Sequence, residues 1–343
     1  MDKIDFAGLE VSAQTLLLEL RRDDRRLPQR SFPNDPTGHR ALVAFLVRPG
    51  RTVRVCLEST GVYGLDAALV LAARPGIEVM VANPRSVHHF GRACMQRSKT
   101  DPIDAALLAE FAARMKFVVW QPPALAVRHL CTIARRLTAL GDQLVVEKNH
   151  LHAASATHTT PACVRRDIER SLANIVRARK RLLADALRLI QDHELLHRRY
   201  RRMIAVPGLG PLSAVQILAE LGLVAAGADV RQVTAYAGLD PREYSSGSSV
   251  HKKTRISKTG NRHLRRALYM PALVAVRHQP DFGALYRRLQ AAGKPKMVAL
   301  TAAMRKLLHA LWAMIKHDQD FDATKLFQAP PVVSTPVPLA AAG

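Results

Sequence analysis

Two long segments in the middle of the chain carry apolar residues at alternating three- and four-residue steps. Residues 130–151 keep this spacing except at Glu147, and residues 168–189 keep it except at Arg179. Such spacing places the apolar side chains on one face of a long helix. A stretch rich in His, Thr and Pro (152–162) separates the two segments. The pattern therefore predicts either a long antiparallel helical hairpin or an intermolecular coiled coil.

The charge of the chain favours nucleic acid as a partner. The 343 residues include 51 Lys and Arg against 28 Asp and Glu, a formal net charge of +23. A surface this basic attracts polyanions, although basic residues on helices also form plain solvated faces. Aromatic residues make up only 5% of the chain, which disfavours large stacking surfaces for single-stranded bases. The outward faces of the central helices are especially basic, for example at Arg177, Arg179, Lys180 and Arg181.

The regions on either side of the central segments differ in pattern, so we expect an α/β domain followed by all-α parts. Residues 1–125 alternate strand-like and helical runs and predict one sheet with helices. Residues 126–200 form the predicted helical arm, and 201–325 a mostly helical C-terminal domain. The Pro- and Ala-rich tail at 326–343 has no capacity for a core and is expected to be disordered. In the first domain we expect strands at 4–11, 15–20, 53–58 and 78–84 and helices at 38–47, 65–73 and 99–115, the last with Asp101 as its N-cap.

The cysteines and the N-terminus indicate a compartment rather than a site. Four cysteines are widely separated and form no CxxC pair, which argues against a zinc ribbon or a disulfide framework. No signal-like segment begins the chain, and no window of about 18 residues is uninterruptedly apolar. We expect a soluble cytoplasmic protein with no membrane partner, associated with the nucleoid when it acts.

Four carboxylates are the strongest candidates for chemistry. Glu10 and Glu58 each end a predicted strand, while Asp101 and Asp104 share one face at the start of a predicted helix. Strand-end and helix-start carboxylates can form an oxygen-lined pocket for two divalent cations, an arrangement suited to phosphoryl transfer. Taken singly, Asp101 is equally well explained as a cap and Glu58 as a turn residue.

A serine-rich run offers a second candidate. The segment SSGSSV (245–250) is followed by the cations Lys252, Lys253, Arg255 and Lys258. A hydroxyl nucleophile beside cations that hold a phosphate would suit strand transfer. The residues alone favour a plainer interpretation, in which a solvated Ser/Gly loop only grips backbone phosphates.

The glycines of PGLGPLSA (207–214) are a third candidate. Gly208 and Gly210 allow a tight turn whose amides can hold a phosphate at a helix start, as in helix-hairpin-helix elements. A simple helix–helix turn explains this pattern equally well.

Several of these motifs together resemble a known family. The segments GLEVSA, CLESTGVYG, ANPRSVHHF, SKTDPIDAALLAEF, PGLGPLSA, YAGLDPREYSSGSS and SKTGNRHLRRALYMPA are similar to the DEDD transposases of the insertion-sequence 110 family, and also to Piv-type DNA invertases. The resemblance is collinear over roughly residues 5–320. It implies an RNase H-like (RuvC-type) N-terminal domain, a coiled coil, and a C-terminal domain with a helix-hairpin-helix-like element.

The resemblance also implies a mechanism and its residues. The carboxylates Glu10, Glu58, Asp101 and Asp104 would bind Mg²⁺, with two ions expected, and Ser246 would become covalently joined to DNA. The active site would be composite across the protomers of a homo-oligomer, either a dimer or a tetramer. A non-coding bridge RNA would pair with donor and target double-stranded DNA. Basic and glycine positions expected to contact nucleic acid are Lys99, Gly208, Gly210, Lys252, Lys253, Arg255, Lys258 and Arg262.

The chain departs from the family pattern at two places. Glu10 stands where the family normally has Asp, which extends the carboxylate by one methylene, and Mg²⁺ is strict about octahedral geometry. Ser245 stands where a Glu is often found, so Ser248 and Ser249 are alternatives to Ser246 as the nucleophile. Two other functions remain open from the sequence. A metal-dependent junction-type nuclease would use water and be indifferent to Ser246, and a non-catalytic RNA- and DNA-binding remnant would cut no strands.

Overall fold

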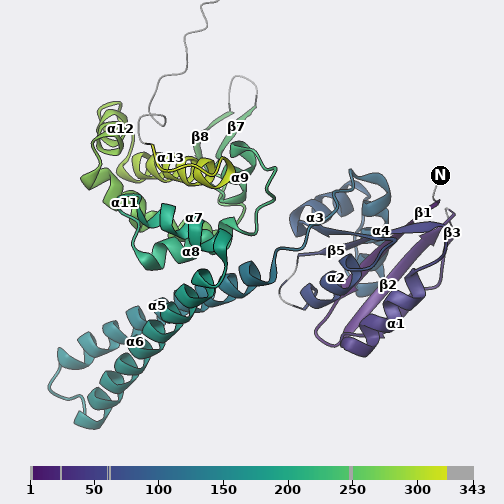
Figure 1. The fold of residues 1–343 in the computed structure, drawn as a ribbon, viewed down its shortest axis with the longest axis horizontal. Helices are drawn as coiled ribbons and strands as arrows, with labels where there is room; N and C mark the ends of the chain where they lie inside the picture. Colours follow the sequence, from purple (N-terminus) through teal and green to yellow (C-terminus); the bar gives the residue numbers. More distant parts are fainter. Residues whose placement is uncertain (1–2, 24, 60, 62, 247–249, 323–343) are drawn as a thin grey trace, which may run out of the picture. The chain divides into compact units, whose positions relative to one another are not determined.

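The computed structural model describes residues 3–322 apart from 24, 60, 62 and 247–249 (Figure 1). The chain divides into two compact units, residues 1–122 and 123–343. The first is a mixed α/β unit, and the second is mostly helical.

The sheet of the first unit combines a hairpin with parallel strands. Its central strand β1 (Lys3–Val11) pairs antiparallel with β2 (Thr15–Arg22) on one side. On the other side β1 pairs parallel with β5 (Arg51–Glu58), which pairs parallel with β6 (Ile77–Ala82). The order is β3-β2-β1-β5-β6, and the short strands β3 (Arg25–Arg26) and β4 (Arg30–Pro33) both pair with β2.

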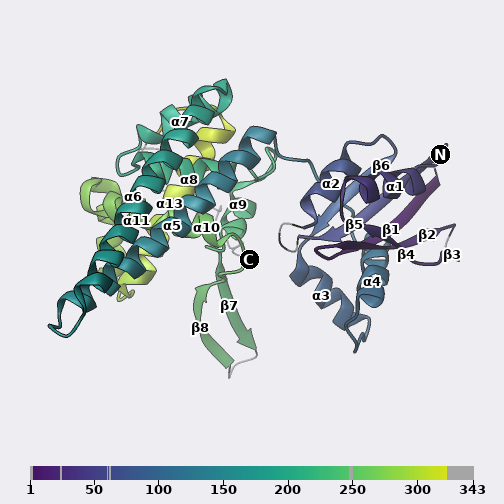
Figure 2. The same cartoon turned by 90° about the horizontal axis from the view of Figure 1, so that it is seen from below.

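Helices cover both faces of this sheet. Alternate residues of β5 point to opposite faces, so Val55 joins the core under α1 and α2 while Cys56 joins the core under α3 and α4. Figure 2 shows the two pairs of helices on opposite sides of the strands: α1 (Pro36–Leu46), α2 (Leu65–Ala72), α3 (Pro84–Ala93) and α4 (Asp101–Arg114).

The predicted strands and helices of the first unit are confirmed within a few residues at their ends, but the strand expected at 78–84 stops at Ala82, and β3, β4 and α3 were not predicted. Thr100, not Asp101, is the N-cap of α4, so Asp101 occupies the first turn of the helix, where its charge favours the positive end of the helix dipole. The segment that forms α3 is polar and has no apolar stripe long enough to predict a helix. The helix is nevertheless capped by the side chain of Asn83 and begins at Pro84.

The central segments form a helical hairpin within one chain. Helices α5 (Leu125–Ser155) and α6 (Ala162–Gln191) pack along each other (Figure 1). The break between them, residues 156–161, is shorter than the predicted one. The base of the hairpin belongs to the core of the second unit, because Leu130, Ala134 and Ile190 are buried in it.

The remaining helices surround α13 (Lys296–Lys316). By length and composition α13 is apolar enough to cross a membrane, but Leu307, Leu308 and Leu311 are fully buried in the core, so α13 is the core helix of this unit. Around it lie α7 (Glu194–Ile204), α8 (Pro211–Leu221), α9 (Val230–Tyr236), α10 (Arg262–Ala267), α11 (Tyr269–His278) and α12 (Pro280–Ala291).

The first two residues and the last residue of the serine-rich run (245–250), which its composition predicted to be a loop, lie in two paired strands. Strands β7 (Pro241–Ser246) and β8 (Val250–Ile256) form an antiparallel two-stranded ribbon, with Ser246 opposite Val250 (Figure 2). Ladder hydrogen bonds between the two strands order a polar sequence that lacks an apolar alternation. Residues 247–249, which include the alternatives Ser248 and Ser249, and the predicted tail at 326–343 lie outside the described residues.

Candidate active site

The predicted carboxylates gather at one edge of the sheet in the first unit. Strands β1 and β5 are parallel, with Gly8 opposite Cys56, so the same register continued by two residues sets Glu10 opposite Glu58. Because the carboxyl ends of parallel strands meet at one edge, both carboxylates lie there. Each is half-buried.

A glycine lets the acidic helix approach this edge. A Cβ atom built at Gly8 would lie 2.0 Å from the carbonyl oxygen of Ala105 and 2.4 Å from the amide nitrogen of Ala109. Only glycine therefore permits α4 to pack directly on β1. This close contact brings Asp101 and Asp104, in the first turn of α4, to the strand-end carboxylates.

The charges of the four acids act on one another. Burial, reinforced by Asp104, Glu58 and Asp101, raises the pKa of Glu10 to about 7. Burial is also the main reason that the pKa values of Glu58 and Asp104 are raised, and neighbouring acids add to both shifts. The anionic forms of Glu10, Glu58 and Asp104 are therefore less stable here than in water, first because the side chains are partly buried and then because neighbouring acids repel them.

Two positively charged or ionisable side chains face the cluster. Lys99, predicted to contact nucleic acid, lowers the pKa of Glu10, Glu58 and Asp104 from just before α4. His88 of α3 acts in the same direction on Glu58. Sequence reasoning missed His88, and the only signal available was its place in the family-like motif ANPRSVHHF.

The donor set fits a divalent cation by its chemistry. Carboxylate oxygens are the ligands that hard divalent cations prefer, and a cation would relieve the repulsion that raises these pKa values. In the part of the chain that the structure describes, no three His, Cys, Asp or Glu side chains converge closely enough to hold a metal ion as they stand. The fit thus rests on charge and on the placement of the four acids at one edge.

The second unit carries the ribbon on a rigid base. At the end of β8 the backbone amide of Ser257 donates to the carbonyl of Asp240, and the Ser257 hydroxyl donates to the Asp240 carboxylate at 2.5 Å. Next to it, Gly260 has φ +140°, and a Cβ there would lie 2.4 Å from the carbonyl oxygen of Tyr236. The two strands are therefore held together at the base of the ribbon, and Ser246, the last residue of β7, lies at its other end.

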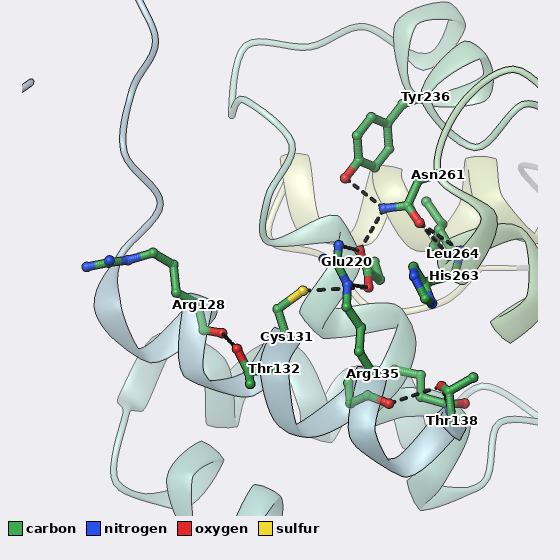
Figure 3. A network of polar contacts seen from close by, with 12 residues as sticks. Arg128, Cys131, Thr132, Arg135, Thr138, Glu220, Tyr236, Asn261, His263 and Leu264 are labelled. Carbon is green, nitrogen blue, oxygen red and sulfur yellow. Dashed lines mark hydrogen bonds and ion pairs between the residues drawn. The ribbon is translucent and has the colours of Figure 1, made fainter. Parts of the chain in front are cut away.

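A buried carboxylate ties that base to the arm (Figure 3). Glu220 of α8 is 1% exposed and accepts two hydrogen bonds from Arg135 of α5, at 2.8 and 3.0 Å. It also accepts one at 2.6 Å from the side-chain amide of Asn261, which in turn caps α10 through its oxygen. The sequence analysis did not identify this network, because a lone Glu in an apolar helix resembles a solvent-facing position.

The other predicted nucleic-acid residues lie in different settings. Gly208 has φ +94°, and a Cβ there would crowd the backbone of α11, so a glycine is needed at this position for the chain to pack against α11. Gly210, at the start of α8, has no neighbouring atom within 4 Å of the place where a Cβ would lie. Arg255, Lys258 and Arg262 are exposed beside the base of the ribbon. Lys252 and Lys253 belong to β8, and their side chains are not described.

Comparison with known proteins identifies the family. Residues 7–157 match a transposase family model named for DEDD and IS110, and residues 200–287 match the model described as Transposase IS116/IS110/IS902 family. A pilin gene-inverting protein of Moraxella bovis is 29% identical over 79% of this chain and 82% of its own length. A 42 kDa protein of insertion element IS900 from Mycobacterium paratuberculosis is 30% identical over 91% of this chain and 95% of its own. The acidic sheet edge, the basic helical unit and these matches make the chain a member of the IS110/IS116/IS902 transposase family, an enzyme that cuts and rejoins DNA strands.

Proposed function

We propose that this transposase transfers DNA strands through a covalent phosphoserine intermediate, with Ser246 as the nucleophile. The metal-dependent part is supported by the carboxylates at one edge of the sheet, where burial and neighbouring acids raise the pKa values of Glu10, Glu58 and Asp104. The serine part is supported by the family-like motif and by the place of Ser246 as the last residue of strand β7.

The carboxylates would hold divalent cations, for which Mg²⁺ and a two-ion site are the proposed identity and number. Bound cations would supply Lewis-acid stabilisation of charge on the scissile phosphate. Glu10, Glu58, Asp101 and Asp104 would be the ligands, and Lys99 beside them would balance the remaining negative charge.

The strand-transfer reaction needs no ATP, because each bond that breaks is replaced by a phosphoester bond of similar energy. The Ser246 oxygen forms a bond to phosphorus, the bond to the 3′-oxygen breaks, and the serine proton ends on the leaving 3′-hydroxyl. A 3′-hydroxyl of the partner strand then attacks the phosphoserine and returns the proton to the serine. The phosphodiester energy is conserved in the Ser–O–P bond.

A suicide DNA substrate, nicked so that religation cannot occur, tests the intermediate. Incubation with the wild-type chain, Mg²⁺ and its co-purified RNA is expected to leave a covalent protein–DNA adduct on a denaturing gel. Ser246→Ala should abolish the adduct, whereas the neighbouring control Ser245→Ala should keep it. Adducts in Ser246→Ala, or an adduct mapped by mass spectrometry to another serine, would contradict the assignment, and hydrolysed ends without any adduct would indicate a nuclease that uses water.

We also propose that a bridge RNA guides the enzyme and that it acts as a homo-oligomer, a dimer or a tetramer, with a composite active site. The net charge of +23 and the basic helical hairpin support RNA as well as DNA binding. Sequencing of RNA that co-purifies with the chain should return one discrete non-coding species. Random cellular RNA in its place would contradict guidance by a bridge RNA. Light scattering that finds only a monomer, alone and on DNA, would exclude the composite site.

A further inference from the structure

A cavity of about 510 Å³ lies within the second unit, between the arm and the helices at the base of the ribbon. One wall comes from α5 and α6, and the other from α8, α10 and α13. Ile256, the last residue of β8, also lines it, so the cavity begins where the ribbon ends.

The cavity is basic, and part of its charge is unbalanced. Among the residues that the structure describes, four arginines line it and no carboxylate does. Arg266 is paired with Asp142, and Arg265 donates to the carbonyl of Ala237 at 2.9 Å. Arg179 and Arg262 form no ion pair with any described residue, and the Nε atom of Arg179 is buried without a hydrogen-bond partner. A group that accepts hydrogen bonds and carries negative charge would satisfy both guanidinium groups.

Arg179 interrupts the apolar spacing of its own helix. Its position in α6 is one at which the pattern of residues 168–189 calls for an apolar side chain. A guanidinium on the inward face of a helical hairpin costs packing free energy, so its presence points to a purpose other than packing.

A glycine opposite Arg179 keeps the cavity open. Gly141 lies in the interior of α5, where glycine weakens a helix. A Cβ built there would meet only the Nη2 atom of Arg179, at 3.9 Å, so no neighbouring atom requires a glycine at this place. The missing side chain leaves room directly over the guanidinium group.

The remaining lining suits a nucleic-acid backbone. Thr138, Ser213 and Gln216 offer hydroxyl and amide groups, and the Gln216 amide already donates to the Thr138 hydroxyl at 2.8 Å. Met270 and Met297 are 56% exposed at the same cavity and present apolar surface to a sugar. Phosphate contacts of this kind position a strand without reading its sequence.

We propose that this cavity binds a backbone phosphate of the DNA duplex, held by Arg179 and Arg262, and so fixes the strand at the base of the β7–β8 ribbon. This inference rests on the proposed function in one respect: it takes the DNA strand bound in the cavity to be the strand that reaches Ser246 on the ribbon.

Fluorescence anisotropy of a labelled DNA duplex with the full chain tests the proposal. Arg179→Gln should weaken binding about five- to tenfold near 0.1 M salt and lower the salt slope by about one. Arg231→Gln is the matched control, because it removes the same charge from an exposed position on α9, away from both the cavity lining and the helical hairpin. It should change the affinity less than about twofold.

A second pair of variants tests the cavity with substitutions that are not expected to destabilise the fold. Gly141→Glu places a carboxylate beside Arg179 and replaces a helix-interior glycine by a better helix former, so the fold should be at least as stable. It should weaken DNA binding as much as Arg179→Gln does. Gly141→Ala, which adds only the Cβ, should keep wild-type affinity.

The outcomes separate this inference from the chemistry proposed for Ser246. Equal affinities for Arg179→Gln and Arg231→Gln, or for Gly141→Glu and Gly141→Ala, would overturn the cavity assignment. So would a loss confined to a single-stranded RNA probe. The covalent-adduct assay fails or succeeds independently of these affinities, because it reports a bond to serine rather than the strength of duplex binding.

Discussion

The pKa values of buried and half-buried acids are shifted in opposite directions in the two units of the molecule. In the second unit burial alone would raise the pKa of Glu220, but hydrogen bonds from Arg135 and Asn261 outweigh burial and lower it. In the first unit burial and mutual repulsion raise the pKa of Glu10, Glu58 and Asp104, and only Lys99 and His88 oppose them.

The difference separates an acid that is neutralised within the fold from the acids that we propose as cation ligands. Glu220 is neutralised within its own chain, so it stabilises the junction of arm, α8 and ribbon base. The sheet-edge acids carry charge that the chain does not neutralise, which is the condition expected of ligands for an external cation.

Asp104→Asn should have the largest effect, and on activity alone. Loss of one cation ligand should lower strand cleavage at least about 100-fold, because charge stabilisation worth several kcal/mol is lost. The melting temperature should stay the same or rise, since a repelling charge is removed. Asp66→Asn is the control, as Asp66 also lies in the first turn of a helix, α2, but outside the cluster. Equal activities for the two variants would remove Asp104 from the site.

Arg135→Met should have the next largest effect, on stability. It leaves the buried Glu220 carboxylate without its main partner, which typically costs about 3 kcal/mol. Urea unfolding of the full chain measures the loss, and Arg136→Met, at the exposed neighbouring position, should cost little. Equal free energies of unfolding for the two variants would show that Arg135 does not stabilise the buried Glu220 carboxylate.

Acid should affect the two units in opposite directions. Burial, aided by Arg305 and Lys306, lowers the pKa of His309 to about 4 from 6.5, so its stabilising contribution is complete above pH 6.5 and is lost as the pH falls toward 4. The pKa of Glu10 is raised to about 7, so its folded form gains stability as the pH falls from 7 toward 4.5. In chelator-treated protein, hydrogen-exchange protection factors, corrected for the fall of the intrinsic exchange rate with pH, should therefore rise in β1 and fall in α13 between pH 7 and pH 5. Changes of the same sign in both protection factors would contradict this.

The smallest effect is expected at an exposed pair. Asp142 and Arg266 are each 55% exposed and form an ion pair at the mouth of the cavity. Asp142→Asn should lower the free energy of unfolding by less than about 1 kcal/mol, because exposed ion pairs contribute little. A loss as large as that of Arg135→Met would show that burial does not distinguish the two kinds of pair.

Sequence patterns predicted the parts in which apolar spacing decides the structure. The strand ending at Glu58 and the helix carrying Asp104 follow directly from alternating and helical spacing, and their acids could be placed together from strand ends alone. Asp101 as a cap was wrong by one residue, because Thr100 and Asp101 are both acceptable at that position.

The parts that depend on long-range polar contacts could not be predicted. The ribbon around Ser246 is polar on both strands, so only its pairing reveals it. Glu220, Arg135 and Asn261 lie far apart in the sequence, and no local pattern links them. Arg179 broke the apolar spacing of its segment but was expected on the outward basic face, and only the packed hairpin shows that it lines a cavity opposite Gly141.

The cation titration of metal-free full-length protein tests the central claim most directly. Unfolding of the first unit, followed by hydrogen exchange in β1 and β5, should shift by about 2.7 kcal/mol when Mg²⁺ reaches 100 times its dissociation constant. The shift should persist in Asp66→Asn and vanish in Asp104→Asn. No stabilisation of the wild type by Mg²⁺ or Mn²⁺, or an equal stabilisation of both variants, would contradict a cation site at the sheet edge.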